Sequence, residues 1–192
     1  MERKIGEEEL LEMISEMDDR ASDGRLKRLR FLFENEDDES APFDGLAYEY
    51  SEEARLCWYA GAYVGTIVMT QLCFEETLRA HFRVILGVKG GLPCGKSVDS
   101  AGFADLIDAA FARELITDAE KTCLTSLRLT RNPYVHPKEV SSQPDLSRPD
   151  VFVQHLKIVA PDLVGQSVEK EAGRAILLLV QSLPRISRRL FP

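Results

Sequence analysis

The sequence predicts an all-α protein, a bundle of about five to six helices. Three observations favour this fold class. Apolar residues recur at spacings of three and four, helix-start signals precede two of these stretches, and the second half lacks the several buried strands of a parallel sheet. The chain has 192 residues, of which 44% are hydrophobic and 29% charged. That composition is typical of a globular protein with one sizeable core.

The N-terminal part of the chain is strongly acidic. Residues 1–53 hold 18 acidic and 7 basic residues, whereas residues 54–192 hold 14 acidic and 17 basic ones. We therefore divide the chain into an acidic helical arm with its linker, 1–50, and a helical bundle domain, 51–192. The formal charge of −8 argues against a protein that coats nucleic acid non-specifically. An enzyme that grips one or two phosphates is still compatible with it.

The arm is predicted to contain helix and linker. Residues 7–33 have a helical pattern, with a division expected at the Ser-Asp-Gly of residues 22–24. Residues 34–45, ENEDDESAPFDG, are typical of a solvated acidic linker.

A long helix is expected to follow, from a cap at Ser51 to an end at Gly87. Apolar residues cover two of its faces, which indicates a position in the middle of the bundle. The small residues Gly61 and Gly65 would let another backbone approach closely. Residues 56–74 carry no charge and reach the length of a membrane span, but interspersed polar residues keep their hydrophobicity modest. We interpret the stretch as a core helix and expect no membrane insertion.

The later elements follow from helix signals. Residues 103–111 predict a short helix, and Thr117 with Glu120 forms a capping-box pattern that starts the next one. Pro133 should end that helix around Asn132. Residues 141–150 are predicted as a loop and residues 151–159 as a short apolar helix or strand. The last helix is expected over about 167–190, with a basic cluster that suits its C-terminal end: Arg185, Arg188 and Arg189.

The cysteines and histidines give no metal signature. No pair among the four cysteines has C-x-x-C spacing, and H-E-x-x-H does not occur. We therefore expect no disulfide framework, no metal and no cofactor. His81 and His155 are interpreted as core or surface residues. Reduced thiols and an N-terminus too acidic for a signal peptide favour a cytoplasmic protein.

Residues 90–97, GGLPCGKS, match the phosphate-loop pattern G-x-x-x-x-G-K-[ST]. In a true phosphate loop, backbone N–H groups cradle phosphates and the lysine neutralises them. That loop needs a preceding strand and a parallel sheet, whereas the preceding VILGV continues a helical pattern. We interpret the match as a helix–helix connection.

Residues 131–137, RNPYVHP, carry the most specific chemistry. Leu124, Leu127 and Arg131 are spaced three and four apart, so the arginine ends the buried face of its helix. A guanidinium against apolar surface needs acceptors, and either Glu75 or Glu76 could supply them, or a phosphate could.

Histidine is the second reactive group in this stretch. His136 can pass a proton in either direction near neutral pH, while an arginine holds a phosphate whose charge grows in the transition state. Together, a proton-transferring histidine and a phosphate-binding arginine are the minimum that RNA cleavage without metal requires.

Arg131-Asn132-x-x-x-His136 resembles the signature of the HEPN (higher-eukaryote and prokaryote nucleotide-binding) superfamily. The predicted order of a long helix, a short helix and a helix that delivers the motif is similar to that family over residues 51–137. Pro133 and Pro137 depart from its pattern.

The resemblance implies a HEPN-like bundle and a metal-independent endoribonuclease, as a toxin or an antiviral-defence effector. The 2′-hydroxyl would attack the adjacent phosphorus in a cleft shared by two protomers. His136 would be acid or base, Arg131 the phosphate clamp, and Asn132 would orient the histidine or the phosphate. Further RNA contacts would come from Arg128, Tyr134 and Lys138. Implied partners are RNA, a second copy, and an antitoxin or other regulatory protein. The alternative is a non-catalytic module of this type that binds nucleotide, RNA or a protein partner.

Overall fold

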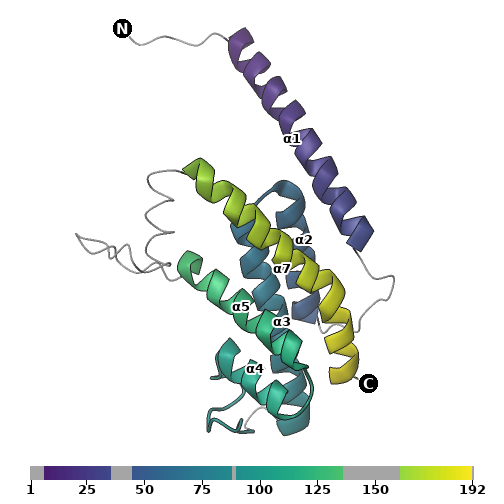
Figure 1. Cartoon of the computed structure of the whole chain (residues 1–192), viewed down its shortest axis with the longest axis vertical. Coiled ribbons are helices and arrows are strands. Elements are labelled where there is room, and N and C mark those ends of the chain that lie inside the picture. Colours follow the sequence, from purple (N-terminus) through teal and green to yellow (C-terminus); the bar gives the residue numbers. More distant parts are fainter. Residues whose placement is uncertain (1–6, 36–44, 88–89, 136–160, 192) are drawn as a thin grey trace, which may run out of the picture.

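The computed structural model describes residues 7–35, 45–87, 90–135 and 161–191, and in these ranges it is a helical bundle (Figure 1). The side chains of residues 7–20, 133–135 and 161–167 lie outside the description. The elements are α1 (Glu7–Asn35), α2 (Gly45–Ala60), α3 (Tyr63–Leu86), α4 (Phe103–Ala112), α5 (Asp118–Val135) and α7 (Pro161–Leu190). Within the described ranges no strand forms, so the predicted all-α class is confirmed.

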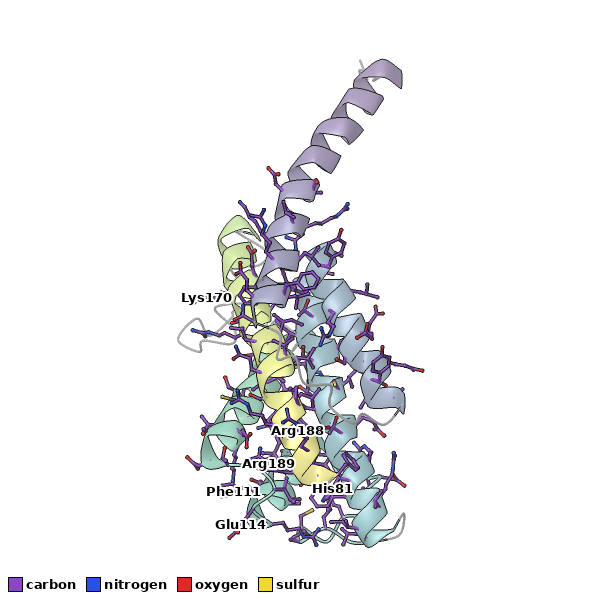
Figure 2. All side chains as sticks on the ribbon, turned by 90° about the vertical axis from the view of Figure 1, so that its right-hand side faces the viewer. His81, Phe111, Glu114, Lys170, Arg188 and Arg189 are labelled. Carbon is purple, nitrogen blue, oxygen red and sulfur yellow. The ribbon has the colours of Figure 1, made fainter. Side chains whose placement is uncertain are left out.

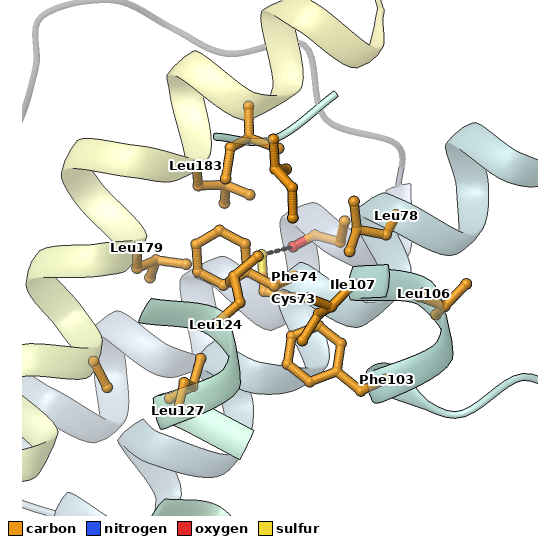
Figure 3. Close-up of a cluster of buried hydrophobic side chains, with 14 of the residues drawn as sticks. Cys73, Phe74, Leu78, Phe103, Leu106, Ile107, Leu124, Leu127, Leu179 and Leu183 are labelled. Carbon is orange, nitrogen blue, oxygen red and sulfur yellow. Dashed lines mark hydrogen bonds between the residues drawn. The ribbon is translucent and has the colours of Figure 1, made fainter. Parts of the chain in front are cut away.

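Helix α3 lies at the centre and contacts α2, α4, α5 and α7. Its side chains Phe74 and Leu78 are fully buried and meet Leu124 of α5 and Leu179 of α7 (Figure 3). A helix with apolar side chains on more than one face needs partners on each of those faces. The predicted central position is confirmed for residues 63–86, and the predicted end at Gly87 holds.

The predicted single long helix is wrong, because the chain turns at Gly61 and forms α2 and α3. Gly61 has a φ of +77°, a conformation that glycine adopts at no steric cost. The Ala62 N–H then donates to the Cys57 carbonyl at 2.8 Å, which closes the turn. Ser51 therefore does not cap a helix but is buried within α2.

Of the two glycines expected to allow a close backbone approach, Gly61 forms the turn and Gly65 serves packing between α2 and α3. A Cβ on Gly65 would lie 2.8 Å from the Sγ atom of Cys57, so only glycine lets α3 lie this close to α2. The uncharged stretch 56–74 is divided between the two helices. No helix within the described residues is long and apolar enough to cross a membrane.

Helix α1 is continuous, so the division expected at residues 22–24 is absent. Its second half packs on the bundle, where the Trp58 indole N–H donates to the Arg28 carbonyl at 3.1 Å. The Phe31 ring lies 5.3 Å from the Trp58 ring. The first half extends away from the bundle (Figures 1 and 2). The boundary that we placed after residue 50 falls within α2, and most of the predicted linker, 36–44, lies outside the described residues.

Of the three later helices, α4 has the predicted bounds, α5 has only the predicted start, and α7 begins earlier than predicted. Helix α4 agrees with the expected 103–111, and α5 begins after Thr117 as its cap requires. Helix α5 continues to Val135 instead of ending near Asn132. A proline removes one hydrogen bond and strains the turn before it, which can bend a helix without ending it. Helix α7 begins at Pro161 rather than near 167, and residues 141–159 lie outside the described ranges.

Candidate functional site

The candidate site lies at the C-terminal end of α5, and the other end of this helix is firmly held. The Glu120 carboxylate accepts hydrogen bonds from the Thr117 N–H at 2.7 Å and hydroxyl at 2.9 Å, which confirms the capping box. It also pairs with the Arg189 guanidinium of α7. Burial opposes ionisation of Glu120, but these hydrogen bonds outweigh it and hold its pKa below the usual value. Arg189, one of the basic cluster at the end of α7, therefore joins α7 to the start of α5.

The buried face of α5 leads to Arg131. Leu124 and Leu127 are buried, and Arg131 is half-buried one turn further along the same face. The Nε atom of Arg131 is buried and has no hydrogen-bond partner within the described part of the chain. A buried donor without an acceptor costs about 1–3 kcal/mol, so this guanidinium is an exception to the usual pairing of buried polar groups.

The two carboxylates considered as internal partners of Arg131 are engaged elsewhere. Glu75 accepts a hydrogen bond from Arg79 at 2.6 Å. Glu76 accepts one from Arg83 at 2.7 Å and lies 3.5 Å from the Arg79 guanidinium. Both arginines belong to α3, so these ion pairs stay within one helix. Among the described residues, neither Glu75 nor Glu76 therefore pairs with Arg131.

The remaining residues of the predicted site are only partly described. Asn132 and Arg128 are half-buried on the last turns of α5. Tyr134 belongs to the last turn of α5, but its side chain lies outside the description, as do His136 and Lys138. The described residues therefore bring Arg131 and Asn132 together at the end of α5. The meeting of these two with His136 stays a prediction.

The phosphate-loop match forms a tight turn. The Leu92 N–H donates to the Lys96 carbonyl at 2.9 Å, and Gly91 and Ser97 form an isolated antiparallel bridge. The Lys96 ammonium lies 2.7 Å from an Asp105 carboxylate oxygen, and this hydrogen bond lowers the pKa of Asp105. The next helix, α4, begins only at Phe103. A phosphate loop leads directly from a strand into a helix, so this geometry does not fit one.

His81 is a core residue, which is one of the two alternatives, core or surface, that the sequence left open. Its Nδ1 atom lies 2.7 Å from the Leu190 carbonyl, which can only accept, so Nδ1 carries the proton. The ring also packs edge-on against Phe82 and Phe191. Burial lowers the pKa of His81, while the hydrogen bond to Leu190 partly opposes that shift. We see a structural role here, holding the end of α7 on α3.

A hollow that the sequence did not reveal lies between α5 and α7. This α5–α7 groove has a volume of about 400 Å³. Its walls are formed by Cys123, Ser126, Leu127, Thr130, Glu171, Arg174, Ala175, Leu177, Leu178, Gln181 and Ser182. In the sequence, the groove is indicated only by small polar residues beside Leu127 in α5 and by Gln181 and Ser182 in α7. These two groups can be recognised as walls of one groove only once α5 and α7 are known to be neighbours.

Within the described ranges, no three histidine, cysteine, aspartate or glutamate side chains lie close enough together to hold a metal ion. No known family model, curated protein or solved structure matches the chain significantly. The resemblance to the HEPN superfamily therefore rests on the motif and the order of the helices.

Proposed function

We propose that this protein is a metal-independent endoribonuclease of the HEPN type. The observation that supports the proposal best is the unpartnered Nε of Arg131 at the end of the buried face of α5, beside Asn132. An arginine presents a planar fork of donors that matches a phosphate. A phosphate of RNA would supply the acceptor that this guanidinium lacks among the described residues.

The proposed reaction is transfer of the phosphoryl group to the neighbouring 2′-hydroxyl. One His136 imidazole takes the proton of the 2′-hydroxyl as its oxygen attacks phosphorus. The bond between phosphorus and the 5′-oxygen breaks, and a protonated imidazole gives that oxygen its proton. The products are a 2′,3′-cyclic phosphate and a 5′-hydroxyl. Arg131 binds the charge that develops on the phosphate oxygens.

In-line transfer needs one base and one acid, whereas each chain supplies a single motif histidine. A homodimer with both motifs facing one cleft supplies two. Asn132 would orient the histidine or the phosphate, while Arg128, Tyr134 and Lys138 would contact the RNA strand. An enzyme that cuts cellular RNA harms its own host, so the proposal includes a toxin or defence role and a regulatory partner that restrains it.

The test is cleavage of single-stranded RNA by the purified full-length chain in EDTA. We expect cleavage with cyclic-phosphate ends, and loss of about 10²–10⁴-fold in rate for His136→Ala at unchanged circular dichroism. His81→Ala is the matched histidine control, with cleavage retained at temperatures where that variant is folded. A requirement for magnesium, or full activity in His136→Ala, would contradict the proposal.

A non-catalytic module of the same type is the second candidate. Pro133 and Pro137 favour it, because they restrict the backbone on both sides of the histidine. This candidate predicts RNA or nucleotide binding without cleavage, and equal behaviour of the wild type and His136→Ala. Size-exclusion chromatography with light scattering separates the two further, since an obligate monomer cannot form the shared cleft.

A further inference from the structure

The α5–α7 groove lies directly beside the proposed phosphate clamp. Thr130, one of its wall residues, immediately precedes Arg131 in α5. The two helices run in opposite directions side by side (Figure 1). Thr130 and Arg174 therefore share the end of the groove nearest the motif, while Gln181 and Ser182 lie at the far end with Cys123.

The groove walls combine apolar surface with uncharged hydrogen-bonding groups. Leu127, Ala175 and Leu178 offer carbon surface, and the hydroxyls of Ser126 and Ser182 both donate and accept. The Gln181 amide adds two donors and an acceptor. A flat ring with polar edges satisfies such walls, whereas an acyl chain would leave their hydroxyls and amide unpaired.

Arg174 supplies the charge that selects an anion. Its side chain is exposed, and it has no ion pair or hydrogen bond within the described part of the chain. The carboxylate of Glu171, on the same wall, already interacts with another group. A free guanidinium at the motif end and neutral polar groups at the far end match a phosphate joined to a base.

We infer that the α5–α7 groove holds one nucleotide of the RNA strand next to the cleaved bond. This inference rests on the proposed function. The nucleotide's phosphate contacts Arg174, and its base lies over Leu127 and Leu178 with an edge toward Gln181. The volume of about 400 Å³ falls within the range of small-molecule sites. Gln181 is then a specificity-determining residue, because a side-chain amide reads the donors and acceptors of a base edge.

The experiment measures binding without cleavage. A fluorescein-labelled, fully 2′-O-methylated single-stranded RNA lacks the attacking hydroxyl, so its anisotropy gives Kd for the full-length wild type. We expect Arg174→Ala to weaken binding about tenfold and to lower the salt slope by about 0.7, the loss of one phosphate contact. Gln181→Ala should weaken binding about two- to tenfold and reduce the difference between oligonucleotides of different base, at unchanged salt slope. Ser126→Phe, which fills the groove, should abolish binding.

Arg25→Ala is the matched control, because Arg25 is an exposed arginine of α1 that does not line the groove. It should bind like the wild type, and thermal unfolding confirms that every variant is folded. Wild-type binding that survives in all three groove variants would overturn this inference and leave the proposed function standing. A wild type that neither binds nor cleaves RNA would overturn both. AMP or UMP bound through Arg174 while RNA is not bound would show a site for free nucleotides, and would overturn the placement of an RNA strand here.

Discussion

Arg131 and Arg79 offer a direct comparison: the Nε atom of Arg131 has no acceptor among the described residues, whereas Arg79 has several. Arg79 donates to the Val98 carbonyl at 2.7 Å and the Ala101 carbonyl at 3.2 Å, and it pairs with Glu75. Its side chain is 12% exposed. Replacing each arginine by methionine keeps most of the aliphatic length and removes the guanidinium. If Arg131 is held for a phosphate, Arg79→Met should destabilise the fold whereas Arg131→Met should not.

The magnitudes follow from the two sets of contacts. Arg131→Met removes a buried donor whose lack of an acceptor costs about 1–3 kcal/mol. The substitution also removes the other contacts of the partly exposed guanidinium, and their loss offsets part of this gain in stability. We expect a free energy of unfolding unchanged or raised by up to about 1 kcal/mol. For a chain of this length that is a Tm higher by at most about 2–4 °C. Arg79→Met leaves carboxylate and carbonyl groups unpaired and should lose about 3 kcal/mol, or roughly 6–12 °C.

The assay is thermal unfolding at pH 7.5, paired with RNA cleavage in EDTA. Arg131→Met should lose about 10²–10³-fold in cleavage rate while its Tm holds or rises. Arg79→Met should lose stability and, at a temperature where it is folded, keep its cleavage rate. A Tm drop in Arg131→Met as large as that in Arg79→Met would mean that the guanidinium is satisfied inside the protomer. The phosphate clamp would then lose its structural support.

Two further predictions concern the fold. Gly61→Ala should lower the free energy of unfolding by about 1–2 kcal/mol, because φ is +77° and the new Cβ would lie 3.2 Å from the Arg28 guanidinium; urea unfolding measures it. For His81, the folded-state pKa lies below the unfolded value of about 6.5, so the unfolded chain binds the proton more readily. The stability that His81 contributes is therefore complete above about pH 6.5 and is lost as the pH falls through its folded pKa. Thermal unfolding between pH 7.5 and 5 should show a pH dependence that is smaller in His81→Asn, whose amide can still donate to Leu190.

The helix ends that were predicted correctly are those set by residues close together in the sequence. The start of α5 follows from Thr117 and Glu120, three residues apart, and their hydrogen bonds form as the pattern requires. The end of α3 at Gly87 is equally local, because that residue has a φ of +71°. The burial of Leu124 and Leu127 followed from helical spacing alone.

Tertiary contacts decided the features that the sequence did not predict. From the sequence alone, Gly61 is equally compatible with a position inside a helix and with a turn between two helices. The turn is stabilised from outside, where the Arg28 Nε donates to the Tyr59 carbonyl at 3.0 Å from a helix 31 residues earlier. Helix α1 continues through residues 22–24, and this contact anchors it to the bundle beyond them. The α5–α7 groove is likewise a property of two helices, with no counterpart in either sequence segment.

The arginines of this chain separate structure from function more clearly than the motif does. Arg28, Arg79, Arg83 and Arg189 each contact an acceptor or an aromatic ring and join parts of the fold. Arg131 is half-buried, like Arg28 and Arg83, but its Nε atom has no such contact among the described residues. Folding alone would favour methionine or leucine at the end of that apolar face, because an unsatisfied donor is a net cost. The unsatisfied donor is therefore the feature on which the proposed phosphate contact rests, because a guanidinium presents a planar fork of donors that matches an oxyanion.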